Sequence, residues 1–278
     1  MIEAKTAHVL LLIKTNSVFL GTKSYKKFTF AAKLHENMND CIVIIPTYNE
    51  IENIESIVRA VLSQHKLFHV LIIDDNSPDR TADKVVMLQA EFEGRLFLEN
   101  RAGKLGLGTA YVHGFKWALE RNYDFIFEMD ADFSHNPNDL VKLHDACHFG
   151  GADLAIGSRY VTGVNVVNWP LSRVLMSYFA SVYVRFITGM KIHDATAGFI
   201  CYKRVVLEKI ELEKIKFVGY AFQIEMKYRT FCKEFEIVEV PIIFTDRTKG
   251  QSKMSSAIFK EAVLGVIALR LKKLVNSL

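Results

Sequence analysis

The sequence has little of what marks secreted, zinc-binding or membrane-spanning proteins. Its four cysteines lie far apart and form no CxxC pair, so neither a zinc site nor a disulfide framework is expected. No charge-free apolar run approaches the about 18–20 residues that span a bilayer. The first residues contain a short apolar stretch but no clean small-residue cleavage site, which argues against a secretory signal. These absences favour a globular cytoplasmic protein with reduced thiols.

Outside the N-terminal segment, positive and negative side chains are equal in number. Residues 1–37 carry six lysines and two glutamates and so account for the whole net charge of +4, which leaves 38–278 balanced. A nucleic-acid footprint would be clustered on the folded domain, so no nucleic-acid partner is expected. Residues 1–37 also show no sustained hydrophobic period. We expect an N-terminal extension over 1–37, with Met38 as the natural start, and one domain over 38–278.

The first half of that domain alternates short apolar runs with helical periods. This order is typical of βαβ crossovers and predicts an α/β fold with a mainly parallel sheet flanked by helices. Strands are predicted at 41–46, 69–75, 95–101, 124–132 and 152–160, and helices at 53–64, 81–92, 108–121 and 137–148.

After Tyr160 the regular alternation of short strands and helices ends. The second half of the domain is predicted to form a layer that covers the same sheet. A long apolar helix is expected at 171–188, a strand followed by a helix at 199–210, and a C-terminal amphipathic helix at 259–274. The strand expected at 234–244 contains Pro241, which places it near a sheet edge.

Acidic side chains follow the predicted strand 124–132. Asp130 and Asp132 are separated by one residue and can share one hard cation, Mg²⁺ or Mn²⁺, that also binds phosphates. A solvated acidic turn that caps the next helix is the alternative. Ligands of open α/β sheets lie beyond the carboxyl ends of the strands, which favours the binding role here.

Other predicted strands also end in polar residues. Asp74 and Asp75 close the second strand, where one acid can accept hydrogen bonds from a base or ribose while NSPD forms the turn. Tyr48 follows the first strand and can stack on a base. Glu50 lies near a helix start, where favourable placement in the helix dipole is the alternative role.

The glycine-rich loop GKLGLGT at 103–109 lacks the spacing of a dinucleotide fingerprint, and no phosphate-binding GxxxxGK[ST] loop occurs. A nicotinamide oxidoreductase is therefore disfavoured. We interpret the glycines as allowing close approach of the backbone to a sugar or phosphate, with a plain turn as the alternative.

Cations on the same edge are candidate phosphate ligands. Arg159 follows a buried strand, Arg173 lies in an apolar helix four residues before Ser177, and Arg247 and Lys253 flank a glycine. His135 can ligate a metal or order its loop. Asp194 is a candidate base, sugar contact or turn residue.

Together these motifs make the sequence resemble the inverting family 2 glycosyltransferases of the GT-A fold, and within them the dolichyl-phosphate mannosyltransferases. The resemblance covers about residues 40–270. It rests on the ordered segments VIIPTYNEIENI, IIDDNSPDRT, KLGLGTAYVHGFKWA, MDADFSHNP, IGSRY, HDATAGF, GYAFQIEM and DRTKGQSK.

The resemblance implies a set of roles. A nucleoside site is implied at Pro46, Tyr48, Glu50, Ile73 and Asp75, a diphosphate and metal site at Asp130, Ala131 and Asp132, phosphate ligands at Arg159, Arg247 and Lys253, and a lipid-phosphate site at Arg173 and Ser177. Ser134 stands where some relatives have a glutamine as third metal ligand. Asp132, Arg159 and Asp194 are the expected catalytic residues.

The implied reaction is transfer of mannose, with inversion, from GDP-mannose to a polyprenyl phosphate. Such an enzyme would work peripherally at the cytoplasmic face of a membrane, held there by the helices 171–188 and 259–274 or by a membrane-anchoring subunit. The first of these helices equally suits a place in the core. Transfer of glucose or another sugar to the same lipid is the alternative function. A non-catalytic sugar-nucleotide-binding protein is a more distant one.

Overall fold

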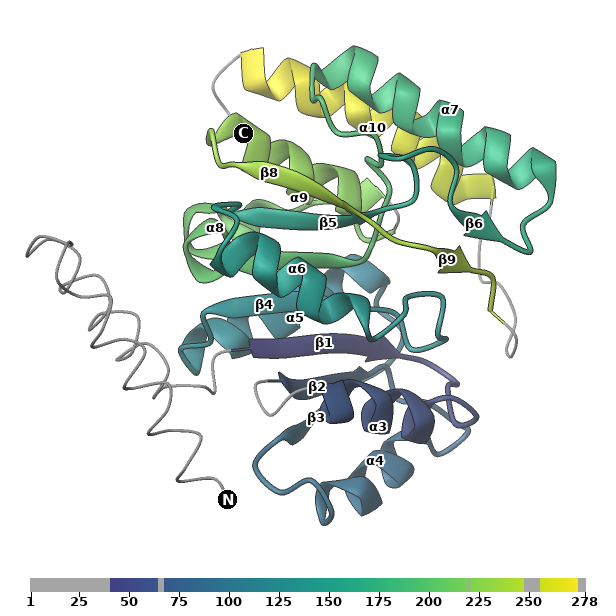
Figure 1. Cartoon of the computed structure of the whole chain (residues 1–278), viewed down its shortest axis with the longest axis vertical. Coiled ribbons are helices and arrows are strands. Elements are labelled where there is room, and N and C mark those ends of the chain that lie inside the picture. The colour runs from purple at the N-terminus through teal and green to yellow at the C-terminus, as the bar shows by residue number, and fades with distance from the viewer. Residues whose placement is uncertain (1–40, 65–67, 220, 248–255, 275–278) are drawn as a thin grey trace, which may run out of the picture. The chain divides into compact units, whose positions relative to one another are not determined.

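The computed structural model describes residues 41–64, 68–219, 221–247 and 256–274. The predicted extension over 1–37 lies outside them. Within this part the chain forms a seven-stranded sheet in the order β3-β2-β1-β4-β7-β5-β8, and the short strands β6 and β9 pair separately (Figure 1). The strands are β1 (Cys41–Thr47), β2 (Phe68–Asp74), β3 (Leu96–Asn100), β4 (Phe125–Glu128), β5 (Leu154–Ser158), β6 (Val166–Val167), β7 (Ile200–Lys203), β8 (Ile237–Pro241) and β9 (Phe244–Thr245).

The expected mainly parallel α/β fold of GT-A type is confirmed, with one strand of opposite direction. β7 runs antiparallel to both β4 and β5, whereas the other neighbours in the large sheet are parallel. The second half of the chain therefore does more than cover the sheet, because it supplies two of its strands. β8 is the last strand in the order, and the edge position predicted from Pro241 is confirmed.

Alternation along the central strands divides the core between the two faces of the sheet. Ile42 and Ile44 belong to one hydrophobic cluster with α5, α8 and α9, whereas Val43 and Ile45 pack with α3, α4 and α6. Figure 1 shows α3, α4 and α6 on one side of the sheet. The helices are α3 (Ile54–Gln64), α4 (Thr81–Gln89), α5 (Leu107–Glu120), α6 (Asp139–His148), α7 (Leu171–Thr188), α8 (Arg204–Lys209), the 3₁₀ turn η2 (Leu212–Lys214), α9 (Ala221–Cys232) and α10 (Ser256–Leu274).

Helix α9 was not expected from the sequence. Every residue from Ala221 to Thr230 is buried, including Glu225, Lys227 and Arg229. Polar residues on all sides of the helix conceal the hydrophobic period on which prediction depends. The structure satisfies them internally: Arg229 donates two hydrogen bonds to Glu225, at 2.9 and 3.0 Å.

Helices α7 and α10 pack against each other beyond β5 and β8 (Figure 1). Only Ser181, Val184 and Thr188 of α7 are buried. Its large apolar side chains are mostly exposed, with Phe179 at 61% and Phe186 at 86%. The alternative that α7 simply completes the core therefore does not fit. No helix among the described residues is both long enough and apolar enough to cross a membrane.

Candidate active site

The turn after β4 carries the two acids predicted to hold a cation. Strand β4 ends at Glu128, and Asp130 and Asp132 both line a cavity of about 460 Å³ at this edge of the sheet. The same cavity is lined by Ser134, Arg159, Arg173, Ser177 and Arg247. Seven of the sequence-predicted residues, contributed by distant parts of the chain, thus border one space.

Asp130 and Asp132 differ in their environments. Burial raises the pKa of Asp130 to about 7, and the negative charges of Asp132, Glu128 and Glu50 add to the rise while Arg247 opposes it. Asp132 is buried, and its Oδ2 lies 3.0 Å from Nη2 of Arg247. Asp130 and Asp132 together therefore form a site of excess negative charge, which a further bound cation would stabilise.

The residues after the acids shape the turn. The backbone N–H of Ser134 donates to Oδ1 of Asp132 at 3.0 Å, while the buried hydroxyl of Ser134 has no hydrogen-bond partner among the described residues. Nδ1 of His135 accepts a hydrogen bond from the N–H of Asp130 at 3.2 Å, and its ring stacks on Phe199. Burial lowers the pKa of His135 to about 4. His135 thus orders the loop as a neutral ring.

Arg159 enters the cavity from the end of β5, held by a buried carboxylate. Its Nε and Nη2 donate to the two oxygens of Asp194 at 2.7 and 2.6 Å, and Nη2 also donates to Thr196 at 2.8 Å. Burial by itself raises the pKa of Asp194, but the charge and hydrogen bonds of Arg159 lower it by more. Asp194 is fully buried and absent from the cavity lining, so its geometry suits orienting Arg159 rather than acting as a base.

Arg173 and Arg247 both line the cavity and are connected through Asp246. Nη1 of Arg173 donates to Asp246 at 2.9 Å, and its guanidinium lies 4.1 Å from the centre of the Trp169 ring. Arg247 directly follows Asp246 in the chain. Ser177 lies one helical turn beyond Arg173 and also lines the cavity. Lys253 lies outside the described residues.

The residues expected to hold a nucleoside lie at the ends of β1 and β2, outside the lining of this cavity. Asp75 is buried and pairs with Arg101, whose Nε lies 2.6 Å from its Oδ1. Burial raises the pKa of Asp75, and Arg101 opposes the rise. Nζ of Lys104 lies 5.0 Å from the centre of the Tyr48 ring. The region predicted to bind the nucleoside therefore joins the ends of β1 and β2 to the loop before α5.

Other residues predicted for the nucleoside and diphosphate sites are buried or half-buried, and their binding roles stay predictions. Ile73 and Ala131 are buried in the hydrophobic core, and Pro46 lies half-buried in β1. Asp74 serves the turn after β2, because its carboxylate accepts hydrogen bonds from Thr47 at 2.8 Å and from the hydroxyl of Ser77 at 2.6 Å. Asp75 is thus the acid of the pair left to face a ligand.

Two glycines at the start of α5, Gly106 and Gly108, are required by packing within the chain. A Cβ on Gly108 would lie 2.6 Å from the carbonyl oxygen of Phe217, and one on Gly106 would lie 3.0 Å from Cβ of Val218. Gly106 also has a φ of 100°. The close contact with residues 217–218 accounts for Gly106 and Gly108, and approach of this loop to a sugar or phosphate stays a prediction.

The cavity has an apolar wall beyond its charged end. Met176, Phe179 and Tyr183 of α7 contribute to it, together with Val266 of α10. Phe179 and Met176 are also exposed on the surface. The cavity therefore reaches the surface along α7, and its lining combines arginines and acids with hydrocarbon.

Sequence reasoning missed several polar residues around the site. Arg101 follows β3 at the same edge of the sheet as the predicted acids, so the strand-end argument could have included it. Glu239 interrupts the otherwise apolar strand β8 and is a signal of the same kind. Asp246 and Gln223 lie in the segments DRTKGQSK and GYAFQIEM that carried the resemblance, but their contacts with distant segments could not be read from the sequence.

This architecture, with paired acids and arginines at the carboxyl edge of a mainly parallel sheet, is that of a GT-A glycosyltransferase. Residues 42–211 match the model of Glycosyl transferase family 2, and the chain belongs to this family. Over 225 residues it is 48% identical to the polyprenol monophosphomannose synthase of Mycolicibacterium smegmatis, a match that covers 81% of this chain and 84% of that protein. It is 44% identical to the undecaprenyl-phosphate mannosyltransferase of Micrococcus luteus, covering 81% of this chain and 91% of that protein.

Solved structures agree in fold at much lower identity. Glucosyl-3-phosphoglycerate synthase from Mycobacterium tuberculosis, crystallised with Mn²⁺, uridine diphosphate and glucosyl-3-phosphoglycerate, superposes with a TM-score of 0.62. The two chains are 17% identical over 87% of this chain and 81% of that one. The likeness shows the fold alone.

Proposed function

We propose that this protein transfers mannose from a nucleotide sugar to a polyprenyl phosphate. The observation that carries the proposal is the lining of the cavity, which combines three aspartates and three arginines with an apolar wall from α7 and α10. A lipid phosphate has a matching combination, an anionic head joined to hydrocarbon. The two mannosyltransferases that share almost half their aligned residues with this chain support the choice of sugar and acceptor.

The donor is GDP-mannose in this proposal. The nucleoside would lie in the region formed by Tyr48, Asp75, Arg101 and Lys104, and the diphosphate would extend from there to Asp130. The carboxylate of Asp75, held by Arg101, is an acceptor for the N–H groups of a base. Guanosine follows from the resemblance to dolichyl-phosphate mannosyltransferases.

The two acids fit a divalent cation. Among the described residues no three acidic, histidine or cysteine side chains gather to hold a metal by themselves. Mg²⁺ or Mn²⁺ on a diphosphate requires few protein ligands, because phosphate and water oxygens fill the remaining positions. Asp130 and Asp132 would hold the ion, next to the unpartnered hydroxyl of Ser134. When bound, the metal neutralises charge on the departing diphosphate.

The chain's own residues account for orientation and charge. An oxygen of the lipid phosphate attacks the anomeric carbon in line, the bond to the diphosphate breaks, and the diphosphate leaves with the electron pair. Arg159 and Arg247 line the cavity and would stabilise the phosphate charges, and Arg173 and Ser177, which line it too, would bind the lipid head. The second pKa of a phosphate monoester is about 6, so the acceptor is already anionic and needs no strong base.

The exposed face of α7 supports peripheral attachment to a membrane. Leu171, Leu175, Phe179, Val182 and Phe186 recur at helical spacing and are all exposed. An interfacial helix buries such a face at the boundary between headgroups and acyl chains. A lipid acceptor would then enter the cavity from the side on which it opens.

Transfer of radiolabelled mannose into lipid extract tests the proposal. The purified chain would be incubated with GDP-mannose and a polyprenyl phosphate in detergent, with Mn²⁺, Mg²⁺ or a chelator. We expect labelled lipid with either metal and none in chelator. UDP-glucose and GDP-glucose in parallel reactions would separate mannosyl from glucosyl transfer.

A pair of matched variants links the activity to the site. Asp132→Asn removes one carboxylate from the cavity and should lower the rate at least about 100-fold. Asp124→Asn makes the same chemical change at an exposed residue and should leave the rate unchanged. Full turnover by Asp132→Asn would contradict the assignment of the site, and absence of labelled lipid with every donor would contradict the function.

A further inference from the structure

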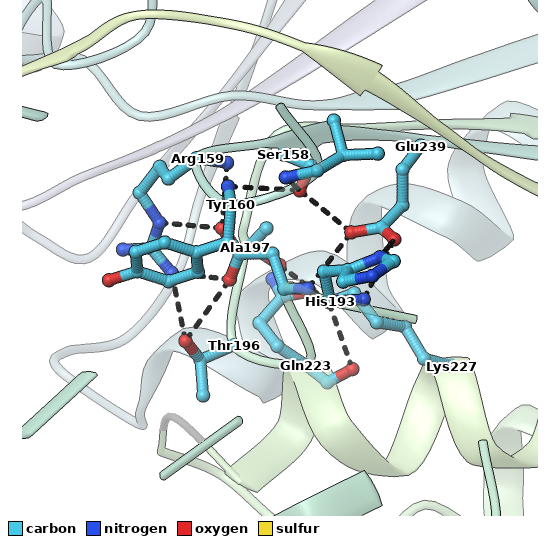
Figure 2. Close-up of polar contacts among 11 residues, drawn as sticks. Ser158, Arg159, Tyr160, His193, Thr196, Ala197, Gln223, Lys227 and Glu239 are labelled. Atoms are coloured by element: carbon cyan, nitrogen blue, oxygen red, sulfur yellow. Dashed lines mark hydrogen bonds and ion pairs between the residues drawn. The ribbon is translucent and has the colours of Figure 1, made fainter. Parts of the chain in front are cut away.

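A second carboxylate, that of Glu239, contacts the segments that carry Arg159 and Asp194, and Figure 2 shows it beside Ser158 and His193. Its Oε1 accepts hydrogen bonds from the hydroxyl of Ser158 at 2.7 Å and from the backbone N–H of Asp194 at 2.9 Å. Its Oε2 accepts from the backbone N–H of His193 at 2.7 Å and lies 2.8 Å from Nδ1 of the same residue. The side chain is only 7% exposed.

These contacts join two segments that the sequence separates. Ser158 immediately precedes Arg159 at the end of β5, and residues 193–194 begin the loop that returns to β7. Glu239 reaches both from β8, where it lies opposite Ile156 of β5. Lys227 holds the same loop further along, because its Nζ donates to the carbonyl of Ala197 at 2.5 Å. The loop that carries Asp194 is thus fixed from two sides.

The consequence reaches the cavity through Arg159. Asp194 binds Nε and Nη2 of that guanidinium, and no residue of the described chain accepts a hydrogen bond from Nη1. Arg159 lines the cavity, so Nη1 is the group left to donate to an anion there. Its direction depends on Asp194, and the position of Asp194 depends on Glu239.

We infer that Glu239 is a positioning residue for the transfer reaction, which fixes the His193–Asp194 turn and thereby aims Arg159 at the phosphate of a bound substrate. The inference rests on the proposed function for its substrate. An acceptor-only group is required at this position, because a backbone N–H donates to each of the two carboxylate oxygens. A glutamine would turn an NH₂ group toward backbone N–H groups and displace the turn.

The test compares Glu239→Gln with Glu236→Gln. Both variants remove one negative charge from the same part of the chain, but Glu236 is exposed. In Glu239→Gln we expect kcat to fall about 10- to 100-fold, because a displaced group loses its effect in the transition state. The KM for the nucleotide sugar should change less than about threefold, since the nucleoside region is remote from the turn. Glu236→Gln should match the wild type.

Hydrogen exchange supplies a measurement that does not depend on activity. The amides of His193 and Asp194 should exchange at least about tenfold faster in Glu239→Gln than in the wild type or in Glu236→Gln, while the sheet amides keep their protection. If Glu239→Gln does not accumulate as folded protein, Glu239→Asp is measured in the same way. It keeps the charge but shortens the reach, and we expect it to lie between the wild type and the glutamine variant.

Unchanged kcat, or unchanged exchange at residues 193 and 194, would overturn the inference. A fall in thermal stability with unaltered kcat would make Glu239 a structural residue only. If the wild type itself transferred no sugar, the proposed function would fail, and the exchange comparison would still decide whether Glu239 holds the turn.

Discussion

Replacing Asp130 by asparagine tests the electrostatics of the site without any substrate. Burial and neighbouring carboxylates raise the pKa of Asp130 from 3.8 to about 7. Between these values the unfolded chain carries the ionised group while the folded protein binds a proton. The folded state therefore loses stability as the pH rises from about 4 to about 7. Asparagine has no charge to desolvate and removes this loss.

The size of the effect follows from the shift. Each pKa unit corresponds to about 1.4 kcal/mol, and two units separate pH 5 from a pKa of about 7, which gives at most about 3 kcal/mol between pH 5 and pH 8. Water in the cavity screens part of the charge. We therefore expect the wild type to lose about 1–2 kcal/mol more than Asp130→Asn over this interval.

Urea unfolding in chelator at pH 5 and pH 8 measures the difference. Asp124→Asn is the control, because Asp124 is exposed and should follow the wild type. Glu128, whose pKa burial also raises to about 7, titrates in both proteins, and its repulsion of Asp130 is part of the difference between them. Equal pH dependence in the wild type and Asp130→Asn would refute the idea that the site carries excess negative charge. Mg²⁺ with GDP should reduce the wild-type loss at pH 8.

Three further predictions concern other parts of the chain. A lysine at position 101 cannot make the hydrogen bonds of Arg101 to both Asp75 and Thr109. In Arg101→Lys the KM for the nucleotide sugar should therefore rise about tenfold with little change in kcat. Arg80→Lys, at an exposed residue, should change neither constant. Phe186→Ser should weaken the flotation of the protein with anionic vesicles, whereas Val86→Ser, which replaces another exposed apolar side chain, on α4, should not. Loss of vesicle binding in both variants, or in neither, would count against α7 as the membrane contact. Vesicle binding absent from the wild type would favour a membrane-anchoring subunit. A chain that begins at Met38 should transfer sugar at a rate within about twofold of the full chain, and an inactive product would contradict the predicted extension over 1–37.

The first half of the fold was predictable because its signals are local. Continuous apolar runs such as 41–46 and amphipathic periods such as 53–64 lie within single elements, and each predicted element is present with ends shifted by a few residues. The antiparallel insertion of β7 between β4 and β5 has no local signal. Helix α9 was hidden because polar and apolar residues are buried on all its sides; Gln223 of this helix, for example, donates a hydrogen bond to Glu128, as Tyr202 of β7 also does.

The candidate site divides in the same way. Residues at strand ends, such as Asp130, Asp132 and Arg159, were predictable because parallel strands present their carboxyl ends at one edge. Their catalytic and binding roles stay predictions. The partners of these residues were not predictable, since the contact of Glu239 with Ser158 and Asp194 depends on the register of β8 against β5, which the sequence does not encode locally.

The opening of the cavity along α7 has a consequence for how an acceptor would be selected. About 460 Å³ is far smaller than a long polyprenyl chain, so only the phosphate and the nearest isoprene units would be enclosed. The rest of the tail would stay dissolved in the bilayer throughout turnover. The protein would then not discriminate between tail lengths, and polyprenyl phosphates of different length would compete with similar affinity.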